Sequence, residues 1–274
     1  MDIKAFKMDG LGNDFVIIDQ RSQNYNLTKD QIIKICDRNF IGCDQLIFIK
    51  KNNEKDAGLE FYNSDGSISG ACGNGTRCVA DLLSKENNDK EIILWTSSGA
   101  LKSQILGDNL VETEIGVPKI NWNEIPLDQN LDTKNLKIKI VNKNNIEHIG
   151  GTSVNVGNPH VVFFVDNIED YNLKKIGPEI ENHKYFPEKC NVTLAQVINK
   201  KLIKVKVWER GAGLTKACGT AACATAVAAN INELTDKTTD IEFALGRLSI
   251  SIDENNSIHM KGPVSDIKNI EINI

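Results

Sequence analysis

The chain has 274 residues, and 32 basic residues against 37 acidic ones give it a formal net charge of −5. Hydrophobic residues make up 41% and charged residues 25%, which is ordinary for a soluble globular protein and argues against disordered and fibrous classes. The mild acidity argues against nucleic acid and membrane as partners, since both would need a basic patch, and no run reaches the roughly 18 apolar residues of a bilayer span.

The first residues, MDIKAFKMDG, carry lysines with no apolar stretch behind them. This pattern argues against a signal peptide and predicts a cytoplasmic, reducing location. An odd number of cysteines in such a compartment indicates free thiols rather than a disulfide framework. The seven cysteines are Cys36, Cys43, Cys72, Cys78, Cys190, Cys218 and Cys223.

In the first half of the chain, the segment GNDFVIID (Gly12–Asp19) combines a Gly-Asn turn with an apolar run, which predicts a turn followed by a strand. The segment CGNGTRCVADLLS (Cys72–Ser84) follows a Gly-rich turn and is mostly apolar or small, which predicts a helix. Arg77 and Asp81 within it have the spacing of a structural i, i+4 pair. Further strands are expected at Leu46–Ile49, Leu59–Tyr62 and Glu91–Trp95.

The second half follows a polar stretch, Pro118–Asn135, which indicates a connector between the halves. GNPHVVFFVD (Gly157–Asp166) again combines a Gly-Asn turn with a strand pattern. CGTAACATAVAAN (Cys218–Asn230) is Ala-rich with few polar residues, which predicts a helix buried on most sides. Further strands are expected at Lys137–Val141, Val192–Val197, Ile203–Trp208 and Leu248–Ile252.

The two halves repeat the same landmarks at an offset of 145 or 146 residues. The matching pairs are Asn13 and Asn158, Gln45 and Asn191, Asn63 and Glu209, and Cys72 and Cys218. Four matches in register favour an internal duplication over coincidence among Gly-Asn turns. We therefore predict an α+β fold of two pseudo-symmetric lobes, each a mostly antiparallel or mixed β-sheet wrapped around a central helix. The lobes are expected at residues 1–117 and 118–263, with 264–274 returning to the first.

A cysteine precedes each predicted helix. The first turn of a helix presents unpaired N–H groups and partial positive charge, which stabilise a thiolate and bind anions. One such cysteine would suggest a nucleophile, whereas two related by symmetry suggest thiols that face one ligand from opposite sides. Such a pair can invert a stereocentre beside a carboxylate: one thiolate removes a proton and the opposing thiol returns one to the other face.

Several strings resemble the bacterial diaminopimelate epimerase family. They are KMDGLGNDFVIID, FYNSDGSISGACGNGTRC, VGNPHVVFFV and WERGAGLTKACGTAAC, with the shorter GPEIENHKYFPE and HMKGPV, and they are spread from Lys7 to Val264. The resemblance implies a cofactor-independent interconversion of LL- and meso-2,6-diaminopimelate in lysine and peptidoglycan precursor synthesis. It also implies two lobes, each a sheet around a helix, with the site in the cleft between them, and a homodimer. No metal and no cofactor are expected.

The resemblance also implies roles for individual residues. Cys72 and Cys218 match the acid/base cysteines, and His160 and Glu209 match residues that support the proton transfers. The backbone donors to the reacting carboxylate match Gly73, Asn74, Gly219 and Thr220. The polar and charged substrate contacts match Asn13, Gln45, Asn63, Asn158, Asn191, Glu209 and Arg210. The residues themselves fit these roles, since Arg210 can fork onto a carboxylate and Glu209 can take an ammonium.

Three positions depart from the family's pattern. Asp9 stands where the family commonly has His, and we assign it no function. Ala221 replaces a Gly after the second cysteine, where we expect little effect because the donors come from Gly219 and Thr220. Phe40 stands where the loop before Gln45 usually has Gly, so the placement of Gln45 depends on this altered loop.

Three alternatives remain open at this point. Cys72 and Cys218 could be small core residues, as we expect of Cys78 and Cys223. A redox-sensing or zinc-binding module could use the thiols for disulfide exchange or metal ligation, although the C-x5-C and C-x4-C spacings are loose for a structural zinc site. A proline racemase or phenazine-pathway isomerase would share the architecture. The former would need a D-R-S-P-C-G-T-G-T-like string, which is absent, and the latter a carboxylate where Cys72 stands.

Overall fold

The computed structural model describes residues 2–53, 56–70 and 72–274. The chain divides into two compact units: unit 1 comprises Met1–Glu114 and Lys261–Ile274, and unit 2 comprises Ile115–Met260. Both units combine helices with a mixed β-sheet, so the α+β class is confirmed. That each unit folds as an independent lobe stays a prediction.

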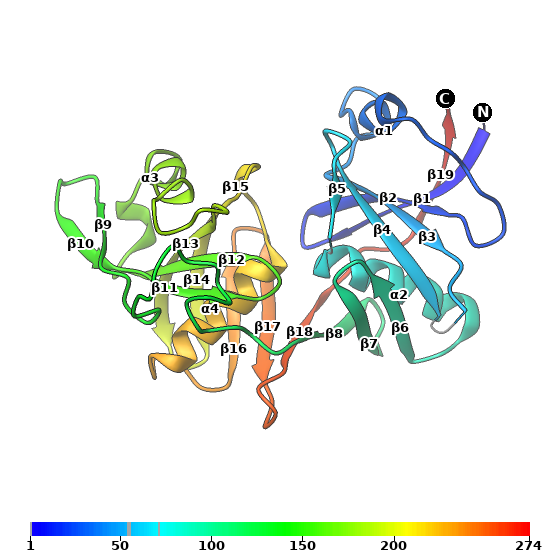
Figure 1. Cartoon of the computed structure of the whole chain (residues 1–274). Coiled ribbons are helices and arrows are strands. Elements are labelled where there is room, and N and C mark those ends of the chain that lie inside the picture. The colour runs from blue at the N-terminus through cyan, green and yellow to red at the C-terminus, as the bar shows by residue number, and fades with distance from the viewer. Residues whose placement is uncertain (1, 54–55, 71) are drawn as a thin grey trace. The chain divides into compact units, whose positions relative to one another are not determined.

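Unit 1 is built on strands that pair in both directions (Figure 1). Strand β2 pairs antiparallel with β1 and parallel with β3, and β3 pairs antiparallel with β4. The order β4, β6, β7, β8 continues with one parallel and two antiparallel pairings, and β19 pairs antiparallel with β1. The elements are β1 (Asp2–Gly10), β2 (Asn13–Asp19), α1 (Lys29–Cys36), β3 (Gln45–Lys50), β4 (Ala57–Asn63), β5 (Ile68–Ser69), α2 (Gly73–Asn87), β6 (Glu91–Thr96), β7 (Gly99–Gly107), β8 (Leu110–Gly116) and β19 (Lys268–Asn273).

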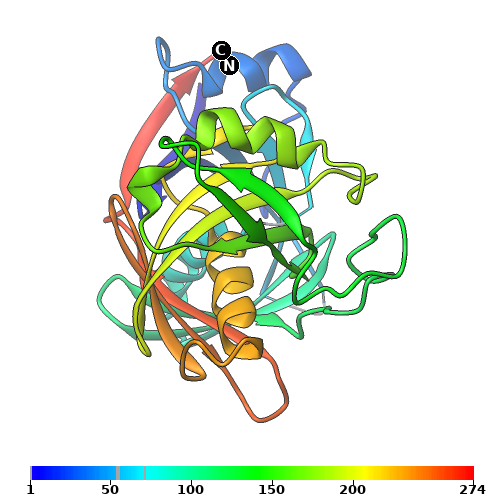
Figure 2. The ribbon, with the colours of Figure 1, turned by 90° about the vertical axis from the view of Figure 1, so that its left-hand side faces the viewer.

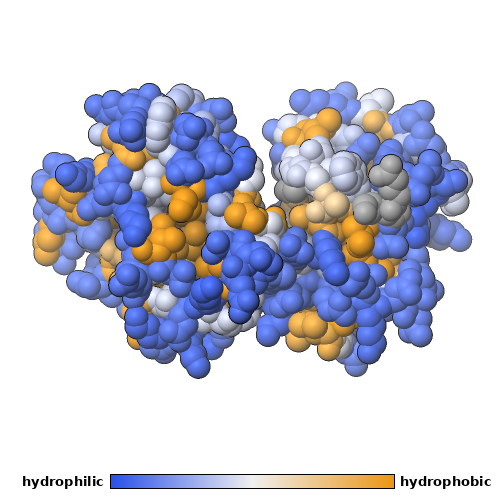
Figure 3. Space-filling view, turned by 60° about the horizontal axis from the view of Figure 1, so that its bottom comes forward, coloured by the Kyte–Doolittle hydropathy of each residue, from blue (hydrophilic) through white to orange (hydrophobic). Residues whose placement is uncertain are grey.

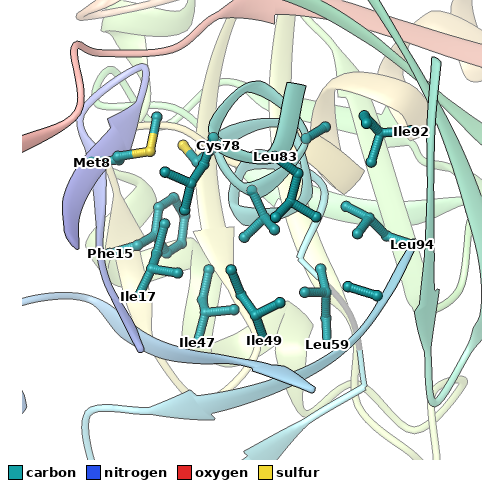
Figure 4. Packing of buried hydrophobic residues seen from close by; sticks show 14 of the residues in the cluster. Met8, Phe15, Ile17, Ile47, Ile49, Leu59, Cys78, Leu83, Ile92 and Leu94 are labelled. Atoms are coloured by element: carbon teal, nitrogen blue, oxygen red, sulfur yellow. The ribbon is translucent and has the colours of Figure 1, made fainter. Parts of the chain in front are cut away.

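Helix α2 lies at the centre of unit 1. Ten of its residues are buried, and the apolar ones meet apolar residues from the surrounding strands. Figure 4 shows Cys78 and Leu83 of α2 turned toward Phe15 and Ile47 on one side and Leu94 on another. Close packing fixes the helix start as well. A Cβ on Gly75 would lie 2.7 Å from Cδ1 of Ile47 and 3.0 Å from Cε1 of Phe61, so a larger residue there would require these side chains to shift.

Unit 2 repeats this arrangement around α4, which Figure 2 shows among its strands. Strand β12 pairs antiparallel with β11 and parallel with β13, and β13 pairs antiparallel with β14. Strand β14 then pairs parallel with β16, and β16 antiparallel with β17. The elements are β9 (Ile138–Val141), β10 (Glu147–Gly150), β11 (Thr152–Asn155), β12 (Pro159–Phe164), a 3₁₀ turn (Ile168–Asp170), α3 (Leu173–Glu181), β13 (Asn191–Asn199), β14 (Leu202–Glu209), β15 (Gly213–Thr215), α4 (Gly219–Ile231), β16 (Thr238–Phe243), β17 (Gly246–Ile252) and β18 (Ile258–Pro263).

The duplication holds element by element. Each unit has an antiparallel strand pair, a helix crossing to a parallel third strand, an antiparallel fourth strand, a central helix and a parallel fifth strand. The nine strands and two helices expected from the sequence are all present. Helices α1 and α3 and the terminal strands β1 and β19 were not predicted from the sequence. Strands β1 and β19 pair although they lie at opposite ends of the chain, and no local pattern indicates such a pairing.

The stretch Pro118–Asn135 packs as part of unit 2 rather than as an open connector. Ile125 and Leu127 are buried in the same apolar cluster as Phe163 of β12. On the face drawn in Figure 3 hydrophilic side chains predominate over smaller hydrophobic areas. Among the described residues no helix combines the length and apolarity that a membrane crossing requires.

Candidate active site

Three amides of unit 1 lie at one edge of its sheet. Asn13 begins β2, Gln45 begins β3 and Asn63 ends β4. The parallel register pairs Phe15 with Gln45, and the antiparallel register pairs Gln45 with Asn63, so all three positions meet at the same end of the strands. Nε2 of Gln45 donates to Oδ1 of Asn63 at 2.9 Å. The altered loop at Phe40 therefore leaves Gln45 in the ladder.

Cys72 is the N-cap residue of α2 and lies half-buried beside this edge. Its Sγ is 3.8 Å from Oδ1 of Asn13, and Nδ2 of Asn74 donates to the same oxygen at 3.3 Å. The first helical bond runs from the Thr76 N–H to the Cys72 carbonyl at 2.8 Å. The N–H groups of Gly73 and Asn74 precede that bond, which makes this helix start an anion-binding geometry next to a thiol.

Buried Arg77 and the acidic residues near Asn13 hold this half-site in place. Arg77 has no exposed surface, and its Nη2 donates to Oδ1 of Asn74 at 2.9 Å. Nδ2 of Asn13 donates to Oδ2 of Asp44 at 3.0 Å. Arg38 in turn reaches both Asp44, at 2.5 Å, and Asp14, at 2.7 Å. Hydrogen bonds thus fix which way the amides of Asn13 and Asn74 point.

Cys218 occupies the equivalent place in unit 2, as the N-cap residue of α4, and is 6% exposed. Burial and the neighbouring charge of Glu209 raise the pKa of this thiol well above its ordinary value. The Thr220 hydroxyl, 3.4 Å from the sulfur, and the Ala221 N–H act in the opposite direction. The first helical bond runs from Ala222 to Cys218, so the N–H groups of Gly219 and Thr220 precede it.

His160 is fully buried on β12 next to two amides. Its Nε2 lies 2.8 Å from Oδ1 of Asn158, and because an amide oxygen only accepts, this nitrogen carries the proton. Burial and the charge of Arg210 lower the pKa of His160 to about 3, so the ring is neutral. Nδ2 of Asn191 donates to the Pro159 carbonyl at 3.0 Å and lies 3.5 Å from Nε2 of His160.

The turn after β14 carries the charged pair of the second half-site. Glu209 ends β14, and the N–H of Arg210 donates to Oδ1 of Asn191 at 3.0 Å. Glu181 of α3, which is 6% exposed, anchors this turn by two hydrogen bonds. It accepts from Nε1 of Trp208 at 2.7 Å and from the Gly211 N–H at 3.2 Å.

Each unit therefore gathers the site residues expected of its own half. In unit 1 these are Asn13, Gln45, Asn63, Cys72, Gly73 and Asn74. In unit 2 they are Asn158, His160, Asn191, Glu209, Arg210, Cys218, Gly219 and Thr220. Each half-site also leaves a buried polar atom unbonded within the described part of the chain, Oε1 of Gln45 in unit 1 and Nδ1 of His160 in unit 2. Such orphaned atoms are expected where a polar ligand completes the hydrogen bonding.

Each central helix has a second cysteine further along, and both of these are core residues, as expected. Cys78 and Cys223 are fully buried. Among residues 2–53, 56–70 and 72–274, no group of three or more His, Cys, Asp and Glu side chains is placed to hold a metal ion.

The family model for diaminopimelate epimerase matches residues 5–121 and 152–267 of the chain. The chain belongs to the diaminopimelate epimerase family. It is 78% identical to a diaminopimelate epimerase of Pelagibacter ubique, and the alignment covers the full length of both chains. It is 43% identical to one of Phenylobacterium zucineum over 94% of each chain. The resemblance drawn from its sequence motifs is thereby confirmed.

Solved structures of lower identity share the fold of this family member. A hydroxyproline epimerase from Agrobacterium vitis aligns over 98% of the chain and 91% of its own length, with a TM-score of 0.68 and 12% identity. A phenazine biosynthesis protein from Bacillus anthracis aligns over the whole of both chains with a TM-score of 0.69 and 16% identity. At such identity these likenesses bear on architecture alone.

Arg77, Asp44 and Glu181 are supporting residues that sequence reasoning did not assign to the site. Arg77 stands in the motif itself, where its interior helix position was the available signal, because a buried arginine needs an acceptor. Asp44 is next to Gln45 in the sequence, but its hydrogen bond is with Asn13, which lies 31 residues away. Glu181 lies 27 residues from Trp208, and no local pattern links them.

Proposed function

We propose that the protein interconverts LL- and meso-2,6-diaminopimelate by a two-base proton transfer between Cys72 and Cys218. The proposal is carried by one observation: two equivalent helices of a duplicated fold both begin at a cysteine with polar neighbours. Asn13 and Asn74 lie beside Cys72, and Thr220 and Glu209 lie beside Cys218. Family membership supports the substrate, and the chemistry of the two half-sites supports the mechanism.

In the proposed reaction a thiolate takes the α-proton of one amino-acid end of the substrate. The electron pair left on the α-carbon is delocalised into the adjacent carboxylate, which the N–H groups of Gly73, Asn74, Gly219 and Thr220 stabilise as its charge grows. The opposing thiol then delivers its proton to the other face of the carbon. Each turnover leaves the first cysteine as the thiol and the second as the thiolate. The protein can then convert a substrate molecule in the reverse direction, or first return to its starting state by proton exchange with water.

Burial favours the thiol form of Cys218, which suits it to deliver a proton when the reacting carbon has become an anion. Neutral His160 is assigned to support the proton transfers through its unprotonated Nδ1. Glu209 adds a negative charge beside Cys218 and accepts the substrate's ammonium group.

The far end of the substrate is assigned to the remaining polar groups. Arg210 is assigned to the non-reacting carboxylate, to which a guanidinium can donate two parallel hydrogen bonds. The amides Asn13, Gln45, Asn63, Asn158 and Asn191 both donate and accept. A substrate that lacks the far amino-acid end would leave these groups unpaired and should be rejected.

The test follows deuterium from solvent into product. The protein is incubated with LL-diaminopimelate in deuterium oxide, and we expect meso product with one deuterium at one α-carbon. Cys72→Ala and Cys218→Ala should each lower epimerisation by about 10²–10⁴-fold, the range for loss of one general acid or base. Cys78→Ala and Cys223→Ala are matched controls, since they remove a buried thiol from the same two helices. Unchanged turnover in either of the first two variants would disprove the mechanism.

The same proposal includes three expectations about the protein's assembly, location and pathway. The family resemblance supports a homodimer, a cytoplasmic location and a role in lysine and peptidoglycan precursor synthesis. Sedimentation analysis of the purified chain would measure the first, and a monomer over a wide concentration range would contradict it.

A further inference from the structure

Two thiols outside the proposed mechanism lie against each other in unit 1. Cys36 ends helix α1, and Cys43 comes two residues before β3. Both are buried, with 3% and 1% of their surface exposed. Their sulfur atoms are 3.4 Å apart, and the Cys43 thiol donates its hydrogen to Cys36.

The backbone already holds the two cysteines together. The Cys43 N–H donates to the Cys36 carbonyl at 3.2 Å, and the Gly42 N–H donates to the Ile35 carbonyl at 3.0 Å. Gly42 has φ of +76°, and a Cβ there would lie 2.9 Å from Cα of Arg38, so the loop closes tightly through a glycine. A disulfide needs a sulfur–sulfur distance of about 2.05 Å, and side-chain rotation over a fixed backbone can supply much of the remaining approach.

The pair lies in the wall of a cavity, and the two thiols differ in character. A cavity of about 360 Å³ is lined by Ile33, Cys36, Asp37, Arg38, Cys43, Asp44 and Ser64. The hydrogen bond from Cys43 lowers the pKa of Cys36, and the Arg38 guanidinium adds to this, whereas burial and the charges of Asp14 and Asp44 oppose it. Donation to Cys36 and burial raise the pKa of Cys43. Cys36 is thus the better nucleophile, with a second thiol in contact.

We propose that Cys36 and Cys43 form an oxidation site at which a hydroperoxide converts the two thiols into an intramolecular disulfide. Cys36 attacks the terminal peroxide oxygen, the O–O bond breaks, and Cys36 becomes a sulfenic acid while hydroxide leaves and takes a proton. The Cys43 sulfur then attacks the sulfenic sulfur and displaces the second hydroxide, which takes the Cys43 proton. For hydrogen peroxide the sum is two thiols oxidised, one peroxide reduced and two waters released.

This site is independent of the proposed epimerase chemistry, because it uses neither Cys72 nor Cys218. It does adjoin the first half-site in sequence. Asp44 follows Cys43 directly and accepts the hydrogen bond from Asn13. A bond between Cys36 and Cys43 therefore forms in the loop that carries an anchor of Asn13.

The chain offers a direct test by peptide mapping. The reduced protein is treated with about one equivalent of hydrogen peroxide, its free thiols are blocked with N-ethylmaleimide, and it is digested with trypsin without reductant. Cleavage after Arg38 separates the two cysteines into ICDR and NFIGCDQLIFIK. We expect these two peptides to be recovered joined by a disulfide and to separate when a reductant is added. The amount of ICDR peptide that carries N-ethylmaleimide on Cys36 should fall about tenfold or more relative to untreated protein.

Single substitutions then identify the order of events. Cys43→Ser should leave a sulfenic acid on Cys36 that dimedone traps, whereas Cys36→Ser should give no dimedone adduct on Cys43. Cys190→Ser, at another fully buried cysteine, is the matched control and should leave the linked peptides unchanged. Recovery of both peptides in blocked form from oxidised wild-type protein would overturn the proposal, as would a dimedone adduct on Cys43 in the Cys36→Ser variant.

Discussion

The two halves of the molecule share a backbone plan and differ in the chemistry they place on it. Helices α2 and α4 begin at equivalent cysteines, yet α2 buries Arg77 and Asp81 whereas the buried part of α4 is made of small, uncharged residues. The first half-site presents neutral amides, and the second adds Glu209, Arg210 and a buried imidazole. Duplication thus preserved the position of the thiol and the helix start, while the side chains around each were free to diverge.

The largest difference between the halves is predicted at the end of the fourth strand, where Asn63 in unit 1 corresponds to Glu209 in unit 2. Glu209→Gln should lower kcat by about 100-fold if the carboxylate supports proton transfer. Because the charge of Glu209 raises the pKa of Cys218, the same change should speed alkylation of Cys218 at neutral pH. Glu179→Gln, at an exposed position of α3, is the control. Loss of activity without faster alkylation would assign Glu209 to substrate binding alone.

Helix α3 packs tightly against its sheet at Gly177. A Cβ on Gly177 would lie 2.9 Å from Cβ of Trp208 and closer still to its ring. The residue equivalent to Trp208 is Tyr62, which instead stacks edge-on against Phe48 at 5.4 Å. Gly177→Ala should therefore cost about 1–3 kcal/mol of unfolding free energy, measured by urea denaturation. Gly107→Ala, where a Cβ meets nothing within 4 Å, should change it by less than about 0.5 kcal/mol.

The two helix-start cysteines should react with iodoacetamide at different rates. Cys72 is half-buried, whereas Cys218 is 6% exposed and has a raised pKa, so less of it is thiolate at neutral pH. We expect Cys72 to be alkylated about tenfold faster in the absence of substrate. Mass spectrometry of tryptic peptides over time measures both rates in one sample. Equal rates would mean that burial does not control access to Cys218.

The last predicted difference concerns the dependence of stability on pH. Phe15 in unit 1 corresponds to His160 in unit 2, and only the latter titrates. The pKa of His160 falls from 6.5 to about 3 on folding, so between these values the unfolded chain binds more protons and stability decreases as pH decreases. The loss is about 1 kcal/mol per pH unit below pH 6. His160→Gln should flatten the dependence of Tm on pH in that range, and an unchanged slope would contradict the assignment.

Sequence patterns predicted the repeated core of the fold because its signals are local. Helix starts, Gly-Asn turns and apolar strands lie within short windows, and their common offset aligned the two halves. The supporting contacts could not be predicted in this way. Glu181 reaches Trp208 and Gly211 across separate elements, and Asn13 meets Asp44 only once β2 and β3 pair. Arg77 was visible in the motif, but its bond to Asn74 depends on the burial of the whole helix face.

Both central helices begin at a residue that is a weak helix cap. Serine, threonine, aspartate or asparagine at Cys72 would accept a hydrogen bond from the first turn and strengthen the helix by roughly 0.5–2 kcal/mol. Neither Cys72 nor Cys218 makes such a side-chain cap hydrogen bond. Variants selected only for heat resistance should therefore tend to exchange these thiols for better caps, and would lose the reaction as they gained rigidity.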